Sequence, residues 1–196
     1  MSGAYHPPMI RLTISDTTAT ITIDDPDRRN ALSNATMREL HAALRSACSD
    51  GAVRAIVVTG AGDRVFSAGG DLSGGFVDDP LADHGGRSAL ADLVRAMRRC
   101  PKPIVGRVNG HALGGGLGLV AACDIAIAAD HARLGTPEIA VGLWPMMITA
   151  VLKPLVPRRP LLEMVLTGRR FDAAEAVELG IINRAVSSAD LDQDVD

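Results

Sequence analysis

The sequence predicts an α/β protein built around one buried sheet. Three apolar runs have the length and composition of strands covered on both faces: Ala55–Thr59, Ile104–Val108 and Ile125–Ala129. Segments with apolar residues at helical spacing lie between the first two runs and after the third, and such alternation is typical of the α/β class. With 196 residues, 47% of them hydrophobic, the chain can form one core, and we expect a single domain over residues 1–196.

The first elements are predicted to be a β-hairpin and a helix. β-Branched residues alternate in Ile10–Ile14 and Thr20–Ile23, on either side of a polar turn. A helix is predicted over Asn34–Cys48, where apolar residues recur three and four positions apart. Ser33 can cap its N-terminus, and Gly51 follows its end.

The later elements continue the alternation. Apolar spacing over Leu90–Met97 predicts a helix between the first two buried strands, and the glycine-rich Gly74–Gly86 before it is expected to be a mobile loop. Three helical segments are predicted after the third strand: Met146–Val156, Pro160–Leu166 and Asp172–Leu179. In the last of these, Asp172 and Glu175 form a capping pair and Gly180 ends the helix.

Composition narrows the class of function. A net charge of -3 and a pI near 5.9 argue against a surface for nucleic acid or anionic membrane, because both need a clustered positive field. The longest apolar stretch, Ala112–Ala129, contains several glycines and Asp124, so it is interpreted as buried core and not as a membrane span. Met1–Pro8 lacks the pattern of a secretory signal. A small-molecule function is therefore expected.

The cysteines and histidines indicate neither a disulfide framework nor a metal site. Cys48, Cys100 and Cys123 are odd in number, far apart in the sequence and never in a CxxC motif, which fits a protein of the reducing cytoplasm. The histidines have no metal-ligand spacing. Four of the last seven residues are aspartates, and the residues after Val186 are expected to be too polar to complete a core. The natural chain is therefore expected to continue.

The first candidate for chemistry is the small-residue turn Phe66–Leu72. Small residues allow a ligand to approach the backbone, whose N–H groups can stabilise negative charge that develops on an oxygen. A plain turn is the alternative interpretation.

The second candidate is the glycine run within Val108–Leu119, where a strand ends and a short helix begins. Free N–H donors there favour an oxyanion or a phosphate. Gly116-x-Gly118-x-x-Ala121 formally matches a dinucleotide fingerprint, but Asp124 follows too soon for the usual helix. Glycines that serve only close packing are a further alternative.

The third candidate is Glu138, a single carboxylate in the nearly apolar segment Gly135–Pro145. Apolar surroundings raise the pKa of an acid and suit it to proton transfer near neutral pH. The alternatives are a helix-capping role or an ion pair with a residue such as Arg133. Trp144 is expected to line a pocket or lie in the core, and His111 is expected to be structural.

Together, these features resemble the enoyl-CoA hydratase/isomerase family, also called the crotonase family. Several motifs occur in the family's order over nearly the whole chain: Arg29–Leu32, Ala68–Asp71, Asn109–Gly116, Cys123–Ile125, Pro137–Glu138 and Gly168–Arg170. The resemblance implies a superhelix of repeated ββα units, assembled as trimers or pairs of trimers. It also implies further C-terminal helices, which this sequence does not contain.

The resemblance implies acyl-CoA thioesters as substrates, with coenzyme A as part of the substrate and no further cofactor or metal. The thioester oxygen would lie between the N–H groups of Gly70 and Gly115, and Glu138 would be the acid-base residue. Adenine would meet the backbone near Ala31, and an arginine would meet the phosphates. The full set of substrate-contacting positions that it implies is Arg28, Arg29, Ala31, Ala68, Asp71, Leu72, Leu113, Gly114, Pro137 and Trp144.

One departure from the family pattern separates possible reactions. Gly118 stands where typical hydratases carry a first glutamate, so only Glu138 remains to hold water or move a proton. This favours isomerisation of an enoyl-CoA double bond over hydration. Leu143–Met147 replaces the usual proline-glycine stretch, which predicts a reshaped acyl pocket. A hydratase that holds water otherwise and a non-catalytic acyl-CoA binding protein are the alternatives.

Overall fold

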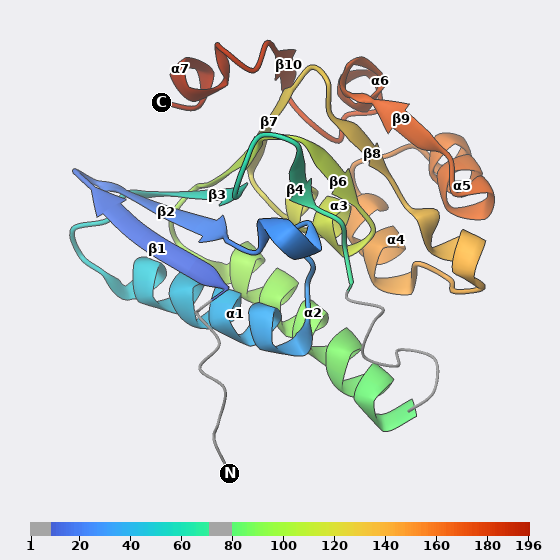
Figure 1. Ribbon diagram of the computed structural model, residues 1–196, viewed down its shortest axis with the longest axis horizontal. Coiled ribbons are helices and arrows are strands. Elements are labelled where there is room, and N and C mark those ends of the chain that lie inside the picture. Colours follow the sequence, from blue (N-terminus) through green and yellow to red (C-terminus); the bar gives the residue numbers. More distant parts are fainter. Residues whose placement is uncertain (1–8, 71–79) are drawn as a thin grey trace.

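Two sheets and their covering helices form the described part of the chain (Figure 1). The computed structural model describes residues 9–70 and 80–196, and the side chains of these except for residues 80–87. The larger sheet has the order β1 (Ile10–Ser15), β2 (Thr18–Ile23), β3 (Ala55–Gly60), β5 (Ile104–Val108), β7 (Ile125–Ala129) and β10 (Arg184–Val186). The smaller sheet has the order β4 (Val65–Ser67), β6 (His111–Leu113), β8 (Arg133–Gly135) and β9 (Arg170–Asp172).

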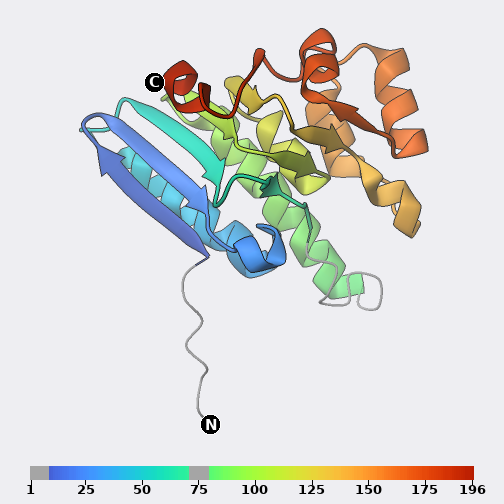
Figure 2. The same ribbon diagram turned by 45° about the horizontal axis from the view of Figure 1, so that its top comes forward.

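The helices lie on two sides of these sheets. Long helices α1 (Asn34–Ser49) and α2 (Pro80–Arg99) pack side by side against the larger sheet, whereas α4–α6 lie at the end of the molecule away from the β1–β2 hairpin (Figures 1 and 2). The remaining helices are short. In chain order they are η1 (Pro26–Arg28), α3 (Gly115–Val120), η3 (Pro137–Val141), α4 (Met146–Leu152), α5 (Arg158–Thr167), α6 (Ala173–Glu178) and α7 (Leu191–Val195).

The larger sheet is the apolar centre of the fold. Its strands pair in parallel from β2 to β10, and only the β1–β2 hairpin is antiparallel. Ile21, Ile56 and Ile104 are completely buried in neighbouring strands. Because the central strands are covered, β3 and β7 are nearly continuous apolar runs, and the predicted bounds of β5 and β7 are confirmed.

The chain contains three copies of a unit made of two strands followed by helical segments. Each of β3, β5 and β7 in the larger sheet is followed directly by β4, β6 or β8 in the smaller sheet and then by helical segments. This agrees with the predicted α/β class and repeated ββα units. The strands of the smaller sheet have only three residues each, too few to show a periodic pattern, and the sequence analysis missed them.

The predictions for the hairpin and the first helix are confirmed. The hairpin turns at Asp16, which has a left-handed φ of 51°, and α1 begins after Ser33, whose hydroxyl accepts a hydrogen bond from the Thr36 amide.

The prediction of a loop over Gly74–Gly86 is wrong for residues 80–86, which are helical, while 74–79 lie outside the described residues. Cooperative extension from the amphipathic part of α2 offsets a cost of about 1 kcal/mol per glycine.

The C-terminal helices also agree with the predictions, with two corrections. Asp172 caps α6 as predicted, but α4 ends at Leu152 and not at Val156, because Pro154 has no N–H group to continue the hydrogen bonds of the helix. The polar end of the chain does contribute to a core. Leu191 of α7 is 2% exposed and packs with Ile127, since the aspartates around it face outward and one of them pairs with Arg107.

Cys48 and Cys100 form a disulfide, so the expectation that the cysteines are unpaired is wrong. They are 52 residues apart in sequence, but their Cα atoms are 6.0 Å apart, within the range that a disulfide spans. Helix packing, which sequence spacing does not reveal, brings them together. The cytoplasmic location inferred from unpaired cysteines stays a prediction. None of the helices in the described ranges is long and apolar enough to cross a membrane.

Candidate active site

Two distant loops meet at one edge of the smaller sheet. The Leu32 amide donates a hydrogen bond to the Gly69 carbonyl at 2.8 Å, and the Ala68 amide donates to the Arg29 carbonyl at 3.0 Å. Arg29 and Asn30 have left-handed backbone conformations, and the buried Asn30 amide group secures the bend by donating to two carbonyls of the β3–β4 segment. The predicted coenzyme A segments around Ala31 and Ala68 are therefore neighbours.

The third segment, around Gly114 and Gly115, approaches the same turn with almost no space between backbones. A methyl carbon added to Gly69 would lie 2.7 Å from the Leu113 carbonyl oxygen and 3.1 Å from the Gly115 nitrogen. One added to Gly115 would lie 3.7 Å from the Gly70 nitrogen. Glycine is needed here because the two backbones approach more closely than side chains permit.

The amides of Gly70 and Gly115 are both available as donors. Within residues 9–70 and 80–196, no oxygen accepts a hydrogen bond from either of them. Gly115 is the first residue of α3, so its amide has no partner within that helix. Two neighbouring amides without acceptors can bind one oxygen atom and stabilise negative charge on it.

Glu138 supplies a carboxylate beside this pair. It lies in η3, directly after β8, and its Oε1 would be 2.6 Å from a methyl carbon at Gly114, whose φ of 51° also favours glycine. Its Oε2 is buried and has no hydrogen-bond partner among the described residues. Burial raises the pKa of Glu138, and a hydrogen bond with its own backbone opposes this rise.

Neither alternative for Glu138 accounts for this position. Arg133 pairs with Asp172 at 3.3 Å, so the alternative in which Arg133 pairs with Glu138 is wrong. The residue before η3 is Thr136, and the carboxylate of Glu138 faces Gly114 of another element. A half-buried acid without a cationic partner is suited to proton transfer.

The wall that Gly118 forms is apolar. Gly118 is buried in α3, and a methyl carbon there would lie 3.5 Å from Ile148 Cγ1 of α4, an ordinary contact distance. Ile148 itself is only 6% exposed. The position that would carry a second carboxylate therefore faces a hydrocarbon side chain.

Some of the other predicted site residues belong to this region, some are exposed, and two lie outside the described residues. Pro137 begins η3, and the Leu113 carbonyl lies next to Gly69, so both belong to the assembled region. Arg28 is exposed and lies 3.8 Å from Asp25. Trp144 is 44% exposed, so the core alternative for it is wrong, and its role as pocket lining stays a prediction. Asp71 and Leu72 lie outside the described residues.

His111 has the structural role that was predicted. Its Nδ1 accepts a hydrogen bond from the Arg133 amide at 3.1 Å, at the start of β8. This end of the smaller sheet is opposite the end that carries Glu138, because β6 and β8 are parallel.

Two apolar residues shape the site in ways that the sequence does not reveal. Leu32 Cδ1 would be 3.2 Å from a methyl carbon at Gly115, and Ile148 covers Gly118. Leu32 was identified only as the last residue of the Arg29–Leu32 motif and Ile148 only as part of a predicted helix, since a linear pattern does not show which element a side chain will meet.

The fold and the arrangement of this site define an α/β protein of the crotonase type. A crystal structure of an enoyl-CoA hydratase from Mycobacterium smegmatis superposes with a TM-score of 0.92 at 32% identity, covering 96% of this chain and 74% of that one. The model of the enoyl-CoA hydratase/isomerase family matches residues 13–195. The chain belongs to that family.

Relatives with curated names agree with this membership. A Thermus thermophilus protein named as an enoyl-CoA hydratase is 39% identical over 172 residues, which are 85% of this chain and 66% of that protein. The carnitinyl-CoA dehydratase of Escherichia coli K12 is 36% identical over 199 residues, covering 97% of this chain and 71% of that enzyme. The chain spans 64–66% of the length of the first two curated relatives, the second of them from Rhizobium meliloti.

Proposed function

We propose that the chain isomerises the double bond of an enoyl-CoA thioester, between the 3-enoyl and the 2-enoyl position. The observation that carries this proposal is a single half-buried carboxylate, Glu138, beside two amides that find no acceptor within residues 9–70 and 80–196, together with the apolar surroundings of Gly118. The names of the relatives, which are enoyl-CoA hydratase and carnitinyl-CoA dehydratase, support a CoA thioester as substrate.

The reaction needs only one acid-base group. The Glu138 carboxylate removes a proton from C2 of the 3-enoyl thioester, and the electrons move onto the thioester oxygen to give a dienolate. The amides of Gly70 and Gly115 donate hydrogen bonds to this oxygen and stabilise its charge. Glu138, now protonated, returns the proton to C4, which leaves the double bond between C2 and C3.

The environment of Glu138 supports this role. Burial raises its pKa, so the carboxylate is a stronger base than a free glutamate. The buried Oε2 has no partner among the described residues, so proton capture does not require a protein hydrogen bond to break at that oxygen.

Hydration is the second candidate, and the names of the relatives favour it. Addition of water requires a second group to orient the water molecule, and Gly118 cannot supply one. The contact distance between position 118 and Ile148 further disfavours a held water, because hydrocarbon offers it no hydrogen bond. We therefore place isomerisation first.

Binding and assembly complete the proposal. Coenzyme A would contact the Ala31 and Ala68 backbone, with Arg28 or Arg29 near its phosphates. We also propose a cytoplasmic homotrimer or pair of trimers that needs no metal and no cofactor besides the coenzyme A of its substrate. These parts rest on the family resemblance, and the adjacency of the Arg29–Leu32 and Ala68–Gly70 segments supports the first of them.

The test gives purified protein a 3-enoyl-CoA and, separately, a 2-enoyl-CoA, and follows the absorbance of the conjugated thioester. Isomerisation predicts that conjugation appears from the first substrate and that the second is not hydrated. Loss of conjugation with formation of a 3-hydroxyacyl product would instead establish a hydratase. No reaction with either substrate, together with measurable binding of both, would leave a non-catalytic acyl-CoA binding protein. A Glu138→Gln variant is the control.

A further inference from the structure

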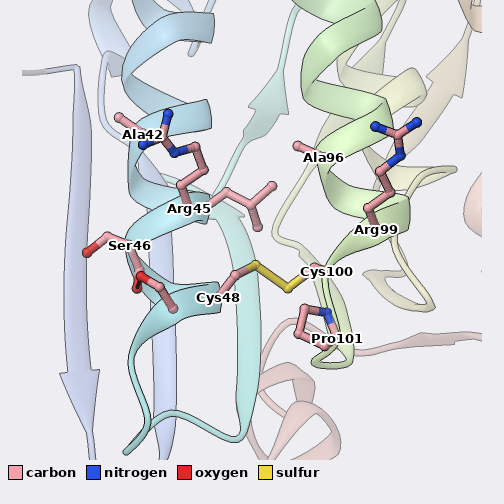
Figure 3. A pocket seen from close by; sticks show the side chains of 10 residues that line it. Ala42, Arg45, Ser46, Cys48, Ala96, Arg99, Cys100 and Pro101 are labelled. Carbon is pink, nitrogen blue, oxygen red and sulfur yellow. Dashed lines mark hydrogen bonds between the residues drawn. A yellow bond between two sulfur atoms is a disulfide. The ribbon is translucent and has the colours of Figure 1, made fainter.

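The Cys48–Cys100 disulfide has no part in the proposed reaction. Cys48 is next to the last residue of α1 and Cys100 directly follows α2, so the bond joins the C-terminal ends of the two helices (Figure 3). The proposed site instead lies near the N-terminal end of α1, where Leu32 and Ser33 precede the helix. The disulfide is therefore a separate chemical feature.

A surface cavity gives access to this bond. It has a volume of about 650 Å³ and is lined by both cysteines and by the facing surfaces of α1 and α2. Arg45 and Arg99 stand on the two helices on either side of the bond (Figure 3). No carboxylate side chain is among the lining residues that the structure describes, so the lining carries two positive charges and no negative one.

We infer that Cys48–Cys100 is a reversible thiol–disulfide exchange site for a small anionic thiol. The cavity admits a small molecule to the sulfur atoms, and its two arginines attract an anion. The positive charge of the lining also favours the thiolate form of the sulfur that leaves when a disulfide is attacked.

The exchange proceeds in two balanced steps. The thiolate of the small thiol attacks one protein sulfur, which forms a mixed disulfide and releases the other cysteine as a thiolate. A second small thiolate then attacks the mixed disulfide and releases the remaining cysteine together with the oxidised small-molecule disulfide. Two electrons pass to the protein, and the two cysteine thiolates take up protons from water. Oxidation is the reverse sequence.

The surrounding structure keeps the two thiols close after reduction. Leu44 and Ala47 of α1 and Val94 and Met97 of α2 are buried in the same core, which the disulfide does not create. Lys102 holds the end of α1 separately, because its ammonium group donates hydrogen bonds to two backbone carbonyls there. Reoxidation therefore needs no large rearrangement of the helices.

Cys123 provides an internal control. Burial, with a smaller contribution from the Asp124 carboxylate, raises its pKa to about 12. Its thiol donates a hydrogen bond to the Leu119 carbonyl. Because exchange requires a thiolate, Cys123 should not react in the folded protein.

The experiment equilibrates the whole chain with mixtures of reduced and oxidised glutathione, then blocks free thiols and determines each cysteine by peptide mass spectrometry. The Cys48–Cys100 disulfide should open and re-form as the ratio changes, while Cys123 stays unlabelled until denaturant is added. In Cys48→Ser, Cys100 should be found as a mixed disulfide with glutathione. A Cys123→Ser variant should behave as the natural sequence does.

The charge preference is tested by rate. At low salt, glutathione, which is anionic, should open the disulfide at least about threefold faster than the cationic thiol cysteamine, after correction for the reactivity of each with a model disulfide. The preference should fall at high salt and in Arg45→Gln with Arg99→Gln. Equal corrected rates would overturn the inference, as would a bond that never forms, or one that does not re-form after reduction in protein that is still folded by circular dichroism.

Discussion

The two walls of the proposed site have opposite chemistry. On one wall, Glu138 brings a half-buried carboxylate to the backbone of Gly114. On the other, Gly118 has no side chain and faces Ile148. One carboxylate can carry a proton from one carbon to another, whereas addition of water needs a second polar group to hold it. The reaction therefore depends on the residue type at position 118 and its surroundings, as well as on Glu138 itself.

The largest effect is expected when the carboxylate of the polar wall, Glu138, is removed. Glu138→Gln keeps the size of the side chain and abolishes proton transfer, so kcat for isomerisation should fall by about 10²- to 10⁴-fold. Steady-state kinetics measures the fall, and thermal unfolding checks that the variant is folded. Turnover within a factor of two of the natural sequence would remove Glu138 from the mechanism.

The next largest effect is expected from a substitution that displaces the Glu138 carboxylate without removing it. In Gly114→Ala, the new methyl carbon would lie 2.6 Å from Glu138 Oε1, so the carboxylate must move and kcat should fall by roughly 10-fold or more. Gly62→Ala is the matched control, because Gly62 also has a positive φ but nothing lies within 4 Å of the added carbon. Gly62→Ala should lose about 1–2 kcal/mol of stability from its positive φ. Gly114→Ala should lose at least as much, because its ψ of -120° lies outside the left-handed helical region, but only Gly114→Ala should lose activity. Equal activity losses would contradict this account.

A third change gives the apolar wall a carboxylate. The Cβ atom of Gly118→Glu fits, but its longer side chain meets Ile148, so hydration should increase little. The double variant Gly118→Glu with Ile148→Ala makes room for the carboxylate and for a water molecule. Its rate of hydration of a 2-enoyl-CoA should exceed that of the natural sequence by about 10-fold or more.

Ile148→Ala alone is the control for this change. It creates a cavity that should cost about 2–5 kcal/mol of stability, and it should not gain hydratase activity. If Gly118→Glu alone hydrated as well as the double variant, Ile148 would have no part in excluding water.

The raised pKa of Glu138 makes two further predictions, for activity and for stability. Proton removal needs the carboxylate, so kcat/KM should rise with pH through a pKa above that of a free glutamate. Because the folded protein binds this proton more tightly than the unfolded chain does, Glu138 should lower the free energy of unfolding as pH rises between its unfolded and folded pKa values. Glu138→Gln should lack that decrease. If kcat/KM instead depends on a pKa at or below that of a free glutamate, burial does not set the proton affinity of Glu138.

The smallest effect on activity is expected at the other end of α1. Loss of the disulfide in Cys48→Ser should lower the free energy of unfolding by about 2–4 kcal/mol. Catalysis at low temperature should change by less than about twofold, because the bond lies apart from the site. Chemical denaturation and steady-state kinetics measure the two quantities. A large loss of kcat in the folded variant would show that the helix ends are coupled to the site.

The parts of the fold that could be predicted from sequence are those specified by local patterns. In the larger sheet, β3, β5 and β7 are mostly apolar runs and the β1–β2 hairpin alternates, whereas the short β10 was not predicted. The Ser33 and Asp172 caps lie directly before their helices. The three-residue strands of the smaller sheet are too short to have such a pattern, and contacts between elements decide where they form. The same reason explains why the Cys48–Cys100 pair was missed.

The site divides in a similar way. Glu138 and the glycines could be identified as candidate site residues from the sequence, because their residue types are unusual for the sequence around them. The roles of Leu32 and Ile148 depend on contacts with Gly115 and Gly118 across the fold, which a single sequence does not reveal.

The most direct test of a single acid-base residue follows one hydrogen atom. A 3-enoyl-CoA carrying deuterium at C2 is converted in ordinary water, and the product of the first turnovers is examined by nuclear magnetic resonance. If Glu138 both removes and returns the proton, part of the deuterium will be found at C4, because the group that returns the hydrogen is the one that removed it. Residual conversion by Glu138→Gln that transfers as much deuterium from C2 to C4 would mean that another group carries the proton and would contradict the account.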